Sequence, residues 1–83
     1  MAVPGMEAGA RLTVGSKQTK LAIESGEAIK VFVALDADAK LVEPIIDQCR
    51  DKGIPLVRAV SMRELGKACG IQVGAAAAAM VHK

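Results

Sequence analysis

The stretch Ile29–Leu35 constrains the fold of this chain more than any other. It reads Ile-Lys-Val-Phe-Val-Ala-Leu, which is almost continuously apolar and rich in β-branched residues. Such a run is typical of a central strand that is covered on both faces, because a strand with one face in water would alternate apolar and polar residues. The chain is therefore expected to build its fold around a fully buried strand.

Shorter signals place further elements before this strand. Leu12–Val14 is predicted to form a brief strand, and Ser16–Ser25 a helix that Gly26 ends in the left-handed conformation. Residues 1–7 are expected to be disordered and residues 8–11 to form a short helical turn, so that a single domain spans residues 8–83.

After the central strand, Pro44 is taken to mark the start of the next helix. Proline is tolerated in the first turn of a helix but not further in. We therefore expect a loose turn over residues 38–42 and a regular helix from about Glu43 to Lys52, ended by Gly53.

A second strand is predicted at Leu56–Val60, followed by the best-marked helix of the chain. Ser61 and Glu64 have the spacing of a capping box, in which each side chain bonds the backbone N–H of the other residue. This helix is expected to run to Cys69 and to stop at Gly70.

The alanine-rich tail Gly74–Val81 can be interpreted in two ways. Alanine is the best helix former, so propensity predicts a helix. The alternation of strands and helices before it calls instead for a closing strand. We predict a strand, because small side chains in a central strand would let the covering helices approach closely.

Composition limits the classes of function. The 83 residues include one aromatic residue (Phe32), one histidine (His82) and two cysteines (Cys49 and Cys69), without the spacing of metal ligands. The cysteines are interpreted as buried thiols of a reducing cytoplasm. No membrane span, signal peptide, cofactor site, metal site or histidine-based catalytic pair is expected, and we predict a cytoplasmic protein without enzymatic activity.

The net charge of +2 is unevenly distributed along the chain. Residues 1–23 carry three basic residues against one acid, residues 24–51 three against seven, and residues 52–83 five against one. If the two ends meet in space they form one basic face, whereas chance scatter over a solvated surface is the plainer alternative.

The stretch Gly15-Ser16-Lys17-Gln18 at the start of the first helix is a candidate anion site. Gly15 allows close approach, Ser16 is expected to be the N-cap, and the open N–H groups of a first turn attract phosphate. Lys17 and Lys20 add positive charge, and Gln18 offers a donor and an acceptor. An ordinary capped helix with solvated lysines is the alternative.

Two stretches resemble the kink-turn-binding ribosomal protein family, the L-seven-Ae group. The first is Gly15-Ser16-Lys17-Gln18-Thr19, followed by Ala22, Ile23, Glu24 and Gly26; the second runs from Leu65 to Ala76. The order of elements between them also matches, so the resemblance covers roughly residues 8–82. The Lys-Gln pair is similar to that of small bacterial, ribosome-associated members.

The resemblance implies an α/β fold, a three-layer α-β-α sandwich around a four-stranded mixed sheet. It also implies a monomer that binds structured RNA, namely a kink-turn with a three-nucleotide bulge and tandem sheared G·A pairs. Whether that kink-turn belongs to ribosomal RNA, a riboswitch or another RNA stays open. The family's helix start reads guanine edges, the loop after its late helix covers the bulge, and a residue near the extruded base often falls at the position of Asp38. Carried over, the RNA-binding residues are Gly15, Ser16, Lys17, Gln18, Lys20, Asp38, Ile71, Gln72, Val73 and Gly74.

The chain departs from the family pattern at Leu21, where a lysine is usual, and has Lys20 instead. A shift of one residue turns a side chain by about 100° on a helix, so Lys20 is expected to meet a phosphate rather than the guanine. Asp36, often the partner of the family's lysine, would then have a different neighbour.

Three alternatives stay open at this point. Gly15-Ser16-Lys17 partly resembles a phosphate loop, although Ala10 stands where that motif needs a glycine. The acidic middle of the chain could instead dock on a ribosomal or ribonucleoprotein partner. Finally, the Ile71–Val73 tip could be a hydrophobic staple that closes a helix end rather than a surface for unstacked bases.

Overall fold

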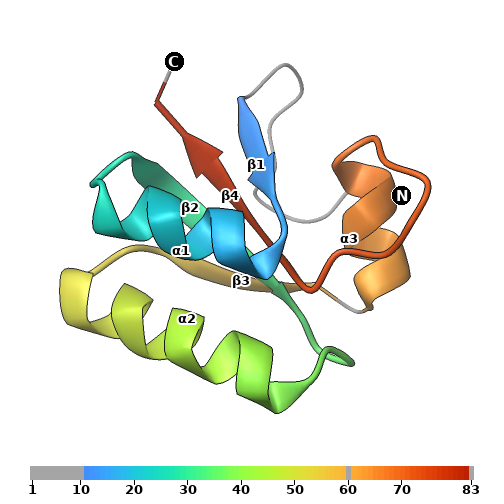
Figure 1. Ribbon diagram of the computed structural model, residues 1–83, viewed down its shortest axis with the longest axis horizontal. Helices are drawn as coiled ribbons and strands as arrows, with labels where there is room; N and C mark the ends of the chain where they lie inside the picture. Colours follow the sequence, from blue (N-terminus) through green and yellow to red (C-terminus); the bar gives the residue numbers. More distant parts are fainter. Residues whose placement is uncertain (1–10, 60, 83) are drawn as a thin grey trace.

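The computed structural model describes residues 11–59 and 61–82, in which strands and helices alternate (Figure 1). The elements are β1 (Leu12–Val14), α1 (Ser16–Glu24), β2 (Ala28–Ala34), α2 (Ala39–Lys52), β3 (Leu56–Ala59), α3 (Met62–Ala68) and β4 (Ala77–Val81). The predictions for residues 1–10 lie outside the described part of the chain. The central strand falls one residue earlier than expected, at Ala28–Ala34.

The strands form one mixed sheet in the order β1-β4-β2-β3. β4 is antiparallel to both β1 and β2, and β2 is parallel to β3. It follows that β1, β2 and β3 run in the same direction, and each of them is followed directly by a helix. All three helices therefore begin at the same edge of the sheet.

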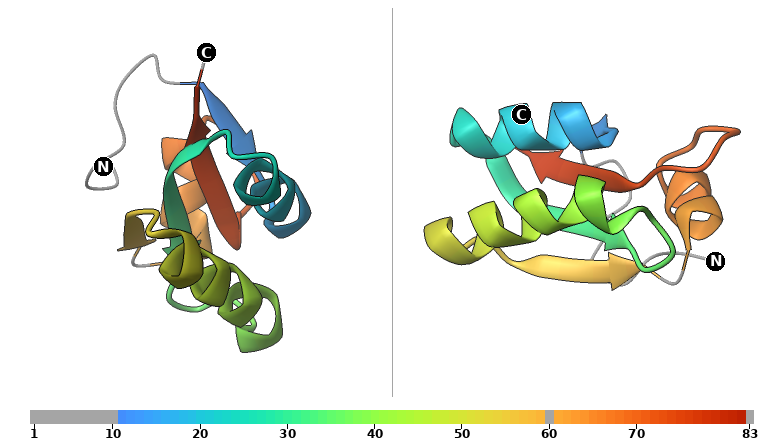
Figure 2. Two further views of the ribbon diagram at one scale, coloured as in Figure 1. Left: turned by 90° about the vertical axis from the view of Figure 1, so that its left-hand side faces the viewer. Right: turned by 60° about the horizontal axis from the view of Figure 1, so that its bottom comes forward.

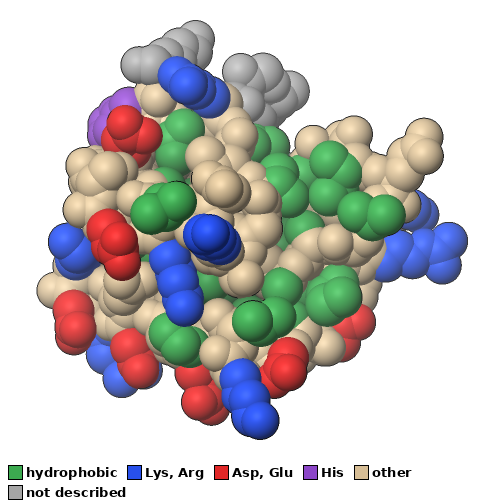
Figure 3. Space-filling view, in the orientation of Figure 1, with side chains coloured by type: hydrophobic (Ala, Val, Ile, Leu, Met, Phe, Trp, Pro, Cys, Tyr) green, Lys and Arg blue, Asp and Glu red, His purple; other side chains and the backbone are tan. Residues whose placement is uncertain are grey.

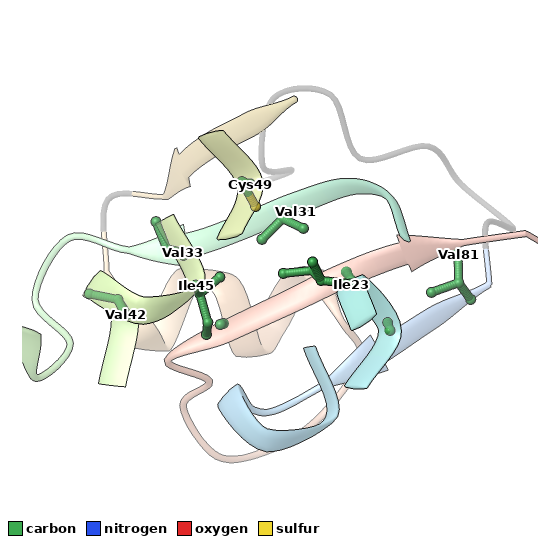
Figure 4. Packing of buried hydrophobic residues seen from close by; sticks show 10 residues of the cluster. Ile23, Val31, Val33, Val42, Ile45, Cys49 and Val81 are labelled. Carbon is green, nitrogen blue, oxygen red and sulfur yellow. The ribbon is translucent and has the colours of Figure 1, made fainter. Parts of the chain in front are cut away.

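Helices cover both faces of the sheet, with α1 and α2 on one side and α3 on the other (Figure 2). The alternation along β2 explains this arrangement, because Val31 and Val33 belong to the cluster under α1 and α2, whereas Phe32 and Ala34 belong to the cluster under α3. The predicted three-layer sandwich is confirmed. Figure 4 shows the packing of the first cluster, in which the labelled side chains are Ile23, Val31, Val33, Val42, Ile45, Cys49 and Val81.

The alanine tail is a strand, as predicted. All five residues of β4 are buried, and they alternate between the two clusters, with Ala77 and Ala79 on the α1 and α2 side and Ala78 and Met80 on the α3 side. A strand with neighbours on both edges and helices on both faces gains more from burial than alanine gains from helix propensity.

The predicted start of α2 is wrong. The helix begins at Ala39 instead of about Glu43, so the residues expected to form a loose turn are already helical and Pro44 lies inside the helix. Asp38 is the N-cap, and its Oδ1 accepts a hydrogen bond from the backbone N–H of Lys40 over 2.9 Å. Pro44 is exposed, so water can satisfy the carbonyl that the missing proline N–H leaves open.

The predicted start of α3 is confirmed. Ser61 is the N-cap in an extended conformation, and its Oγ accepts a hydrogen bond from the backbone N–H of Glu64 over 3.1 Å. The helix ends at Ala68, and Gly70 follows with a φ of +81°. None of the helices in the described ranges is long and apolar enough to cross a membrane.

Candidate functional site

The start of α1 and the loop between α3 and β4 lie side by side at the edge where the helices begin (Figure 1). Backbone hydrogen bonds hold them there. The N–H of Gly15 donates to the carbonyl of Ala77 over 2.8 Å, and the N–H of Ala34 donates to the carbonyl of Ala76 over 2.9 Å. Ala76 and Ala77, at the start of β4, thus bring together the two stretches that the resemblance predicts to form one site.

Gly15 shapes the start of α1 through its backbone. Its φ of +106° and ψ of +149° are accessible to glycine and strained for other residues, and a Cβ built on it would meet no atom within 4 Å. Thr19, fully buried, donates its hydroxyl proton to the Gly15 carbonyl over 2.8 Å. The buried Thr19 side chain thus holds the Gly15 carbonyl, whereas the side of Gly15 on which a Cβ would stand faces open space.

The expectation that Ser16 caps α1 is wrong. Gly15 is the N-cap, Ser16 is already the first helical residue, and among the described residues no side chain caps this end. A serine can cap only from an extended position before the helix. Here Gly15 takes the N-cap position, so the first helical residue is Ser16 instead of Lys17.

The backbone N–H groups at the start of α1 are consequently open. Among residues 11–59 and 61–82, nothing accepts a hydrogen bond from the N–H of Ser16, Lys17 or Gln18, and the first turn contains no acidic residue. The side chains of Lys17 and Gln18 are exposed. Open N–H groups, the positive end of the helix dipole and a lysine together favour an anion at this position.

At the starts of the other two helices on this edge, side chains of the protein itself accept hydrogen bonds from backbone N–H groups of the first turn. We call these starts closed. Asp38 accepts from Lys40 at the start of α2. At the start of α3, Asp36 Oδ1 accepts from the backbone N–H of Met62 over 2.7 Å. Asp38, predicted as a ligand-contact residue, is exposed but has this capping role as well.

The α3–β4 loop combines an anchored residue with an exposed tip. Ile71 is half-buried and packs against the cluster under α3, so the staple interpretation holds for this residue. Gln72, Val73 and Gly74 are exposed, and Val73 has 71% of its surface accessible. An apolar side chain held this far into solvent is available for contact with a ligand.

Two glycines let the loop pass close to α3. A Cβ on Gly66 would overlap the carbonyl oxygen of Val73, and a Cβ on Gly74 would lie 3.1 Å from the Cβ of Met62. The N–H of Ile71 donates to the carbonyl of Gly66, and the N–H of Ala75 donates to that of Met62, each over 3.0 Å. The loop is therefore fixed against the helix at both of its ends.

A shallow pocket of about 300 Å³ lies beside α1, on the side of β1. Its lining includes Gln18 and Leu21, and Leu21 is 49% exposed. Lys20 is half-buried and, two residues from Gln18, is turned by about 200° away from this pocket. Gln18 and Lys20 therefore lie on different sides of α1. This agrees with the expectation that Lys20, which replaces the family's lysine at position 21, meets a different part of the RNA from Gln18.

Charged side chains of both signs lie on the face that α1 and α2 cover. Figure 3 shows basic side chains in the middle of this face, over α1, and acidic and basic side chains together along the lower rim, where α2 lies. The exposed acids of this region are Asp36, Asp38, Glu43, Asp47 and Asp51. The basic ends of the chain do not form one face, since α1 and α3 lie on opposite sides of the sheet, although both begin at the shared edge.

The cysteines are free thiols. Cys49 is buried as predicted, but Cys69 is only half-buried. Desolvation raises the pKa of both thiols above the ordinary value, which keeps them protonated at neutral pH. Within the described ranges, no three side chains of the types that bind metals come together.

Comparison with known families explains why these features occur together. The sequence profile of the ribosomal protein L7Ae/L30e/S12e/Gadd45 family matches residues 3–83. The chain belongs to this family. The match includes both the start of α1 and the α3–β4 loop, and it confirms the resemblance on which the site was predicted.

Two similar proteins from bacteria are named for RNA binding. The chain is 43% identical over 77 residues to the RNA-binding protein YbxF of Geobacillus stearothermophilus, and the match covers 93% of each chain. It is 46% identical over 68 residues to an RNA-binding protein of Caldanaerobacter subterraneus, covering 82% of this chain and 83% of that protein. The names of these relatives agree with a binding protein rather than with an enzyme.

Two solved structures share the fold. The 15.5kD RNA binding protein of Giardia lamblia superposes with a TM-score of 0.81 at 30% identity, over 87% of this chain and 61% of that one. A protein of unknown function from Bacillus halodurans superposes with a TM-score of 0.77 at 22% identity, over 86% of this chain and 71% of that protein. The second match speaks for the fold alone.

Three features that shape the site are not predicted by the sequence. They are the hydrogen bond from Thr19 to Gly15, the close contact of Gly66 with the Val73 carbonyl, and the bond between Asp36 and Met62. A threonine four residues after a helix-starting glycine is a weak local signal for the Thr19 bond. The other two contacts depend on segments that are distant in sequence.

Proposed function

We propose that this chain binds kink-turn RNA, with the start of α1 in the groove beside the sheared G·A pairs and the α3–β4 loop over the bulged nucleotides. The observation that carries the proposal is the open first turn of α1, which stands next to two helix starts that the protein closes with its own side chains. The similarity to proteins named RNA-binding supplies the class of ligand.

The polar half of the site fits a distorted RNA groove. The deep and narrow major groove of regular A-form RNA excludes side chains, so a protein that inserts a helix start needs a widened groove such as that of a kink-turn. In the proposal the N–H groups of Ser16 and Lys17 face phosphate or a base edge. Gln18 bonds a purine edge, and Lys17 donates to guanine or phosphate. Lys20, on another side of α1, meets the phosphate backbone.

The apolar half of the site fits unstacked bases. The single aromatic residue, Phe32, is fully buried, so stacking on an aromatic platform is excluded. The exposed Val73 instead offers an aliphatic surface, and Gln72 and Gly74 flank it in the same loop. Asp38, which caps α2 at the same edge of the sheet, is assigned to the extruded nucleotide.

Calorimetric titration at physiological salt tests the proposal. One RNA is a short kink-turn, and its control carries Watson–Crick pairs in place of the sheared G·A pairs. We expect tight binding with one protein per RNA for the kink-turn, as for a monomer, and much weaker binding for the control. Equal binding of both RNAs would contradict kink-turn recognition. No binding of either would leave docking through the exposed acidic side chains of residues 36–51 as the leading alternative.

A further inference from the structure

Asp36 connects two parts of the molecule that the chain separates by 26 residues. It follows the end of β2, and its Oδ1 accepts a hydrogen bond from the backbone N–H of Met62, the first residue of α3, over 2.7 Å. A hydrogen bond to a carboxylate is about twice as strong as one between neutral groups. The side chain is exposed, so it contributes this bond rather than apolar packing.

Met62 is also the point where the α3–β4 loop returns to the protein. Its carbonyl accepts a hydrogen bond from the N–H of Ala75 over 3.0 Å, immediately after the exposed tip. Gly74 lies against the same residue, since a Cβ there would be 3.1 Å from the Met62 Cβ. Both backbone groups of Met62 are thus engaged, one by Asp36 and one by the loop.

These bonds close a ring, and the start of α1 is bonded to the residue that follows it in the chain. From Asp36 it passes through Met62 and Ala75 to Ala76, whose carbonyl accepts from the N–H of Ala34, two residues before Asp36. The next carbonyl of β4, that of Ala77, accepts from Gly15. The position of the loop relative to α1 therefore depends on the link from Asp36 to Met62.

We infer that Asp36 is a positioning residue for RNA binding, an inference that rests on the proposed function. Its carboxylate sets where the first turn of α3, and with it the Ile71–Gly74 loop, lies relative to the open start of α1. Ser61 offers a matched comparison, because it caps the same helix through a local bond to Glu64 and, among the described residues, its side chain makes no hydrogen bond to β2.

The direction of the change in RNA affinity when Asp36 is replaced distinguishes a positioning role from an electrostatic one. Loss of an acidic side chain close to bound RNA would by charge alone strengthen binding. Positioning predicts the reverse for Asp36→Ala, a loss of roughly tenfold in affinity, the scale of one hydrogen bond to a charged group. Asp36→Asn keeps an oxygen that can accept from Met62 and should retain most of the affinity. Asp36→Glu keeps the charge but displaces the oxygen and should weaken binding.

The first measurement is amide hydrogen exchange in the free protein. In Asp36→Ala the amides of Met62 and Ala75 should exchange faster, while the amide of Val31 in the central strand stays protected and shows that the fold persists. Unchanged exchange at Met62 and Ala75 would overturn the inference without reference to RNA. Should Asp36→Ala fail to fold, Asp36→Glu gives the same comparison.

The second measurement is binding of the kink-turn RNA in two double-mutant cycles. Asp36→Ala should couple with Val73→Ala in the loop and should be additive with Gln18→Ala on α1. Ser61→Ala should cost less affinity than Asp36→Ala, and equal losses would assign the effect to the stability of α3 alone. If the wild type binds and Asp36→Ala binds equally well, the inference fails and the proposed function stands. If the wild type does not bind, the proposed function fails and the positioning role fails with it.

Discussion

The starts of α1 and α3 lie at the same edge of the sheet and each contains a serine, yet they differ in which groups accept hydrogen bonds from their first N–H groups. Ser61 precedes α3 in an extended conformation and caps it, and Asp36 accepts from the next residue. Ser16 lies inside α1, behind a glycine with a positive φ, and the first N–H groups there have no acceptor among the described residues.

The difference teaches which helix start is structural and which is available for binding. A start whose N–H groups are bonded by the protein's own oxygens has little affinity left for an external anion. An open start carries the cost of unpaired groups until water or a ligand satisfies them. The open start of α1 is therefore the better candidate for RNA, and five substitutions test the contrast.

Gly66→Ala should have the largest effect of these substitutions, a loss of stability in α3, the helix whose start is closed by Asp36 and Ser61. The added methyl group would overlap the Val73 carbonyl, which is backbone and cannot turn aside. We expect a loss of about 3 kcal/mol in the free energy of unfolding, measured by urea denaturation, as in overpacked cores. Gly26→Ala is the control, since it has a φ of +78° but open space, and should cost roughly 1–2 kcal/mol. A Gly66→Ala variant as stable as the wild type would mean that the loop is not held against α3.

Gln18→Ala should weaken RNA binding by roughly 1–3 kcal/mol, the scale of a good base contact. Since Gln18 is exposed, the free energy of unfolding should stay within about 0.5 kcal/mol of the wild type. Calorimetry with the kink-turn RNA measures the first and denaturation the second. Equal affinity of the variant and the wild type would remove Gln18 from the site.

Ser61→Ala and Ser16→Ala test the comparison itself. Removal of the Ser61 cap should lower the free energy of unfolding by about 1 kcal/mol. Ser16 makes no capping bond, so its removal should change stability by less than about 0.5 kcal/mol. Equal losses in urea denaturation would show that both helices are capped in the same way.

Lys20→Ala should have the smallest effect, mainly on the salt dependence of binding. Loss of one phosphate contact should reduce the slope of log K against log salt by about 0.7–0.9. Lys52→Ala, at the far end of α2, is the control and should leave the slope unchanged. The measurement is a series of titrations between low and physiological salt, and a slope unchanged by Lys20→Ala would place this lysine away from the phosphates.

Local signals predicted most of the fold correctly. Gly26, Gly53 and Gly70 end their helices with positive φ, a preference that belongs to glycine itself. The apolar run over residues 29–35 and the Ser61–Glu64 spacing located β2 and α3 because strand burial and helix capping involve neighbouring residues. The exceptions are the starts of α1 and α2, where the conformation of Gly15 and the cap by Asp38 outweighed signals from Ser16 and Pro44.

By itself, the sequence determined the α/β class, the buried central strand, the helix ends and, through its two motifs, the family and the residues expected to meet RNA. These features depend on side-chain period, on backbone preference and on residue identity, all of which are local. Only the tertiary structure decided that β4 inserts between β1 and β2, that the Gly66 backbone supports the loop, and that Asp36 reaches Met62. These contacts join residues that are distant in the chain, so their geometry exists only once the sheet has brought the segments together.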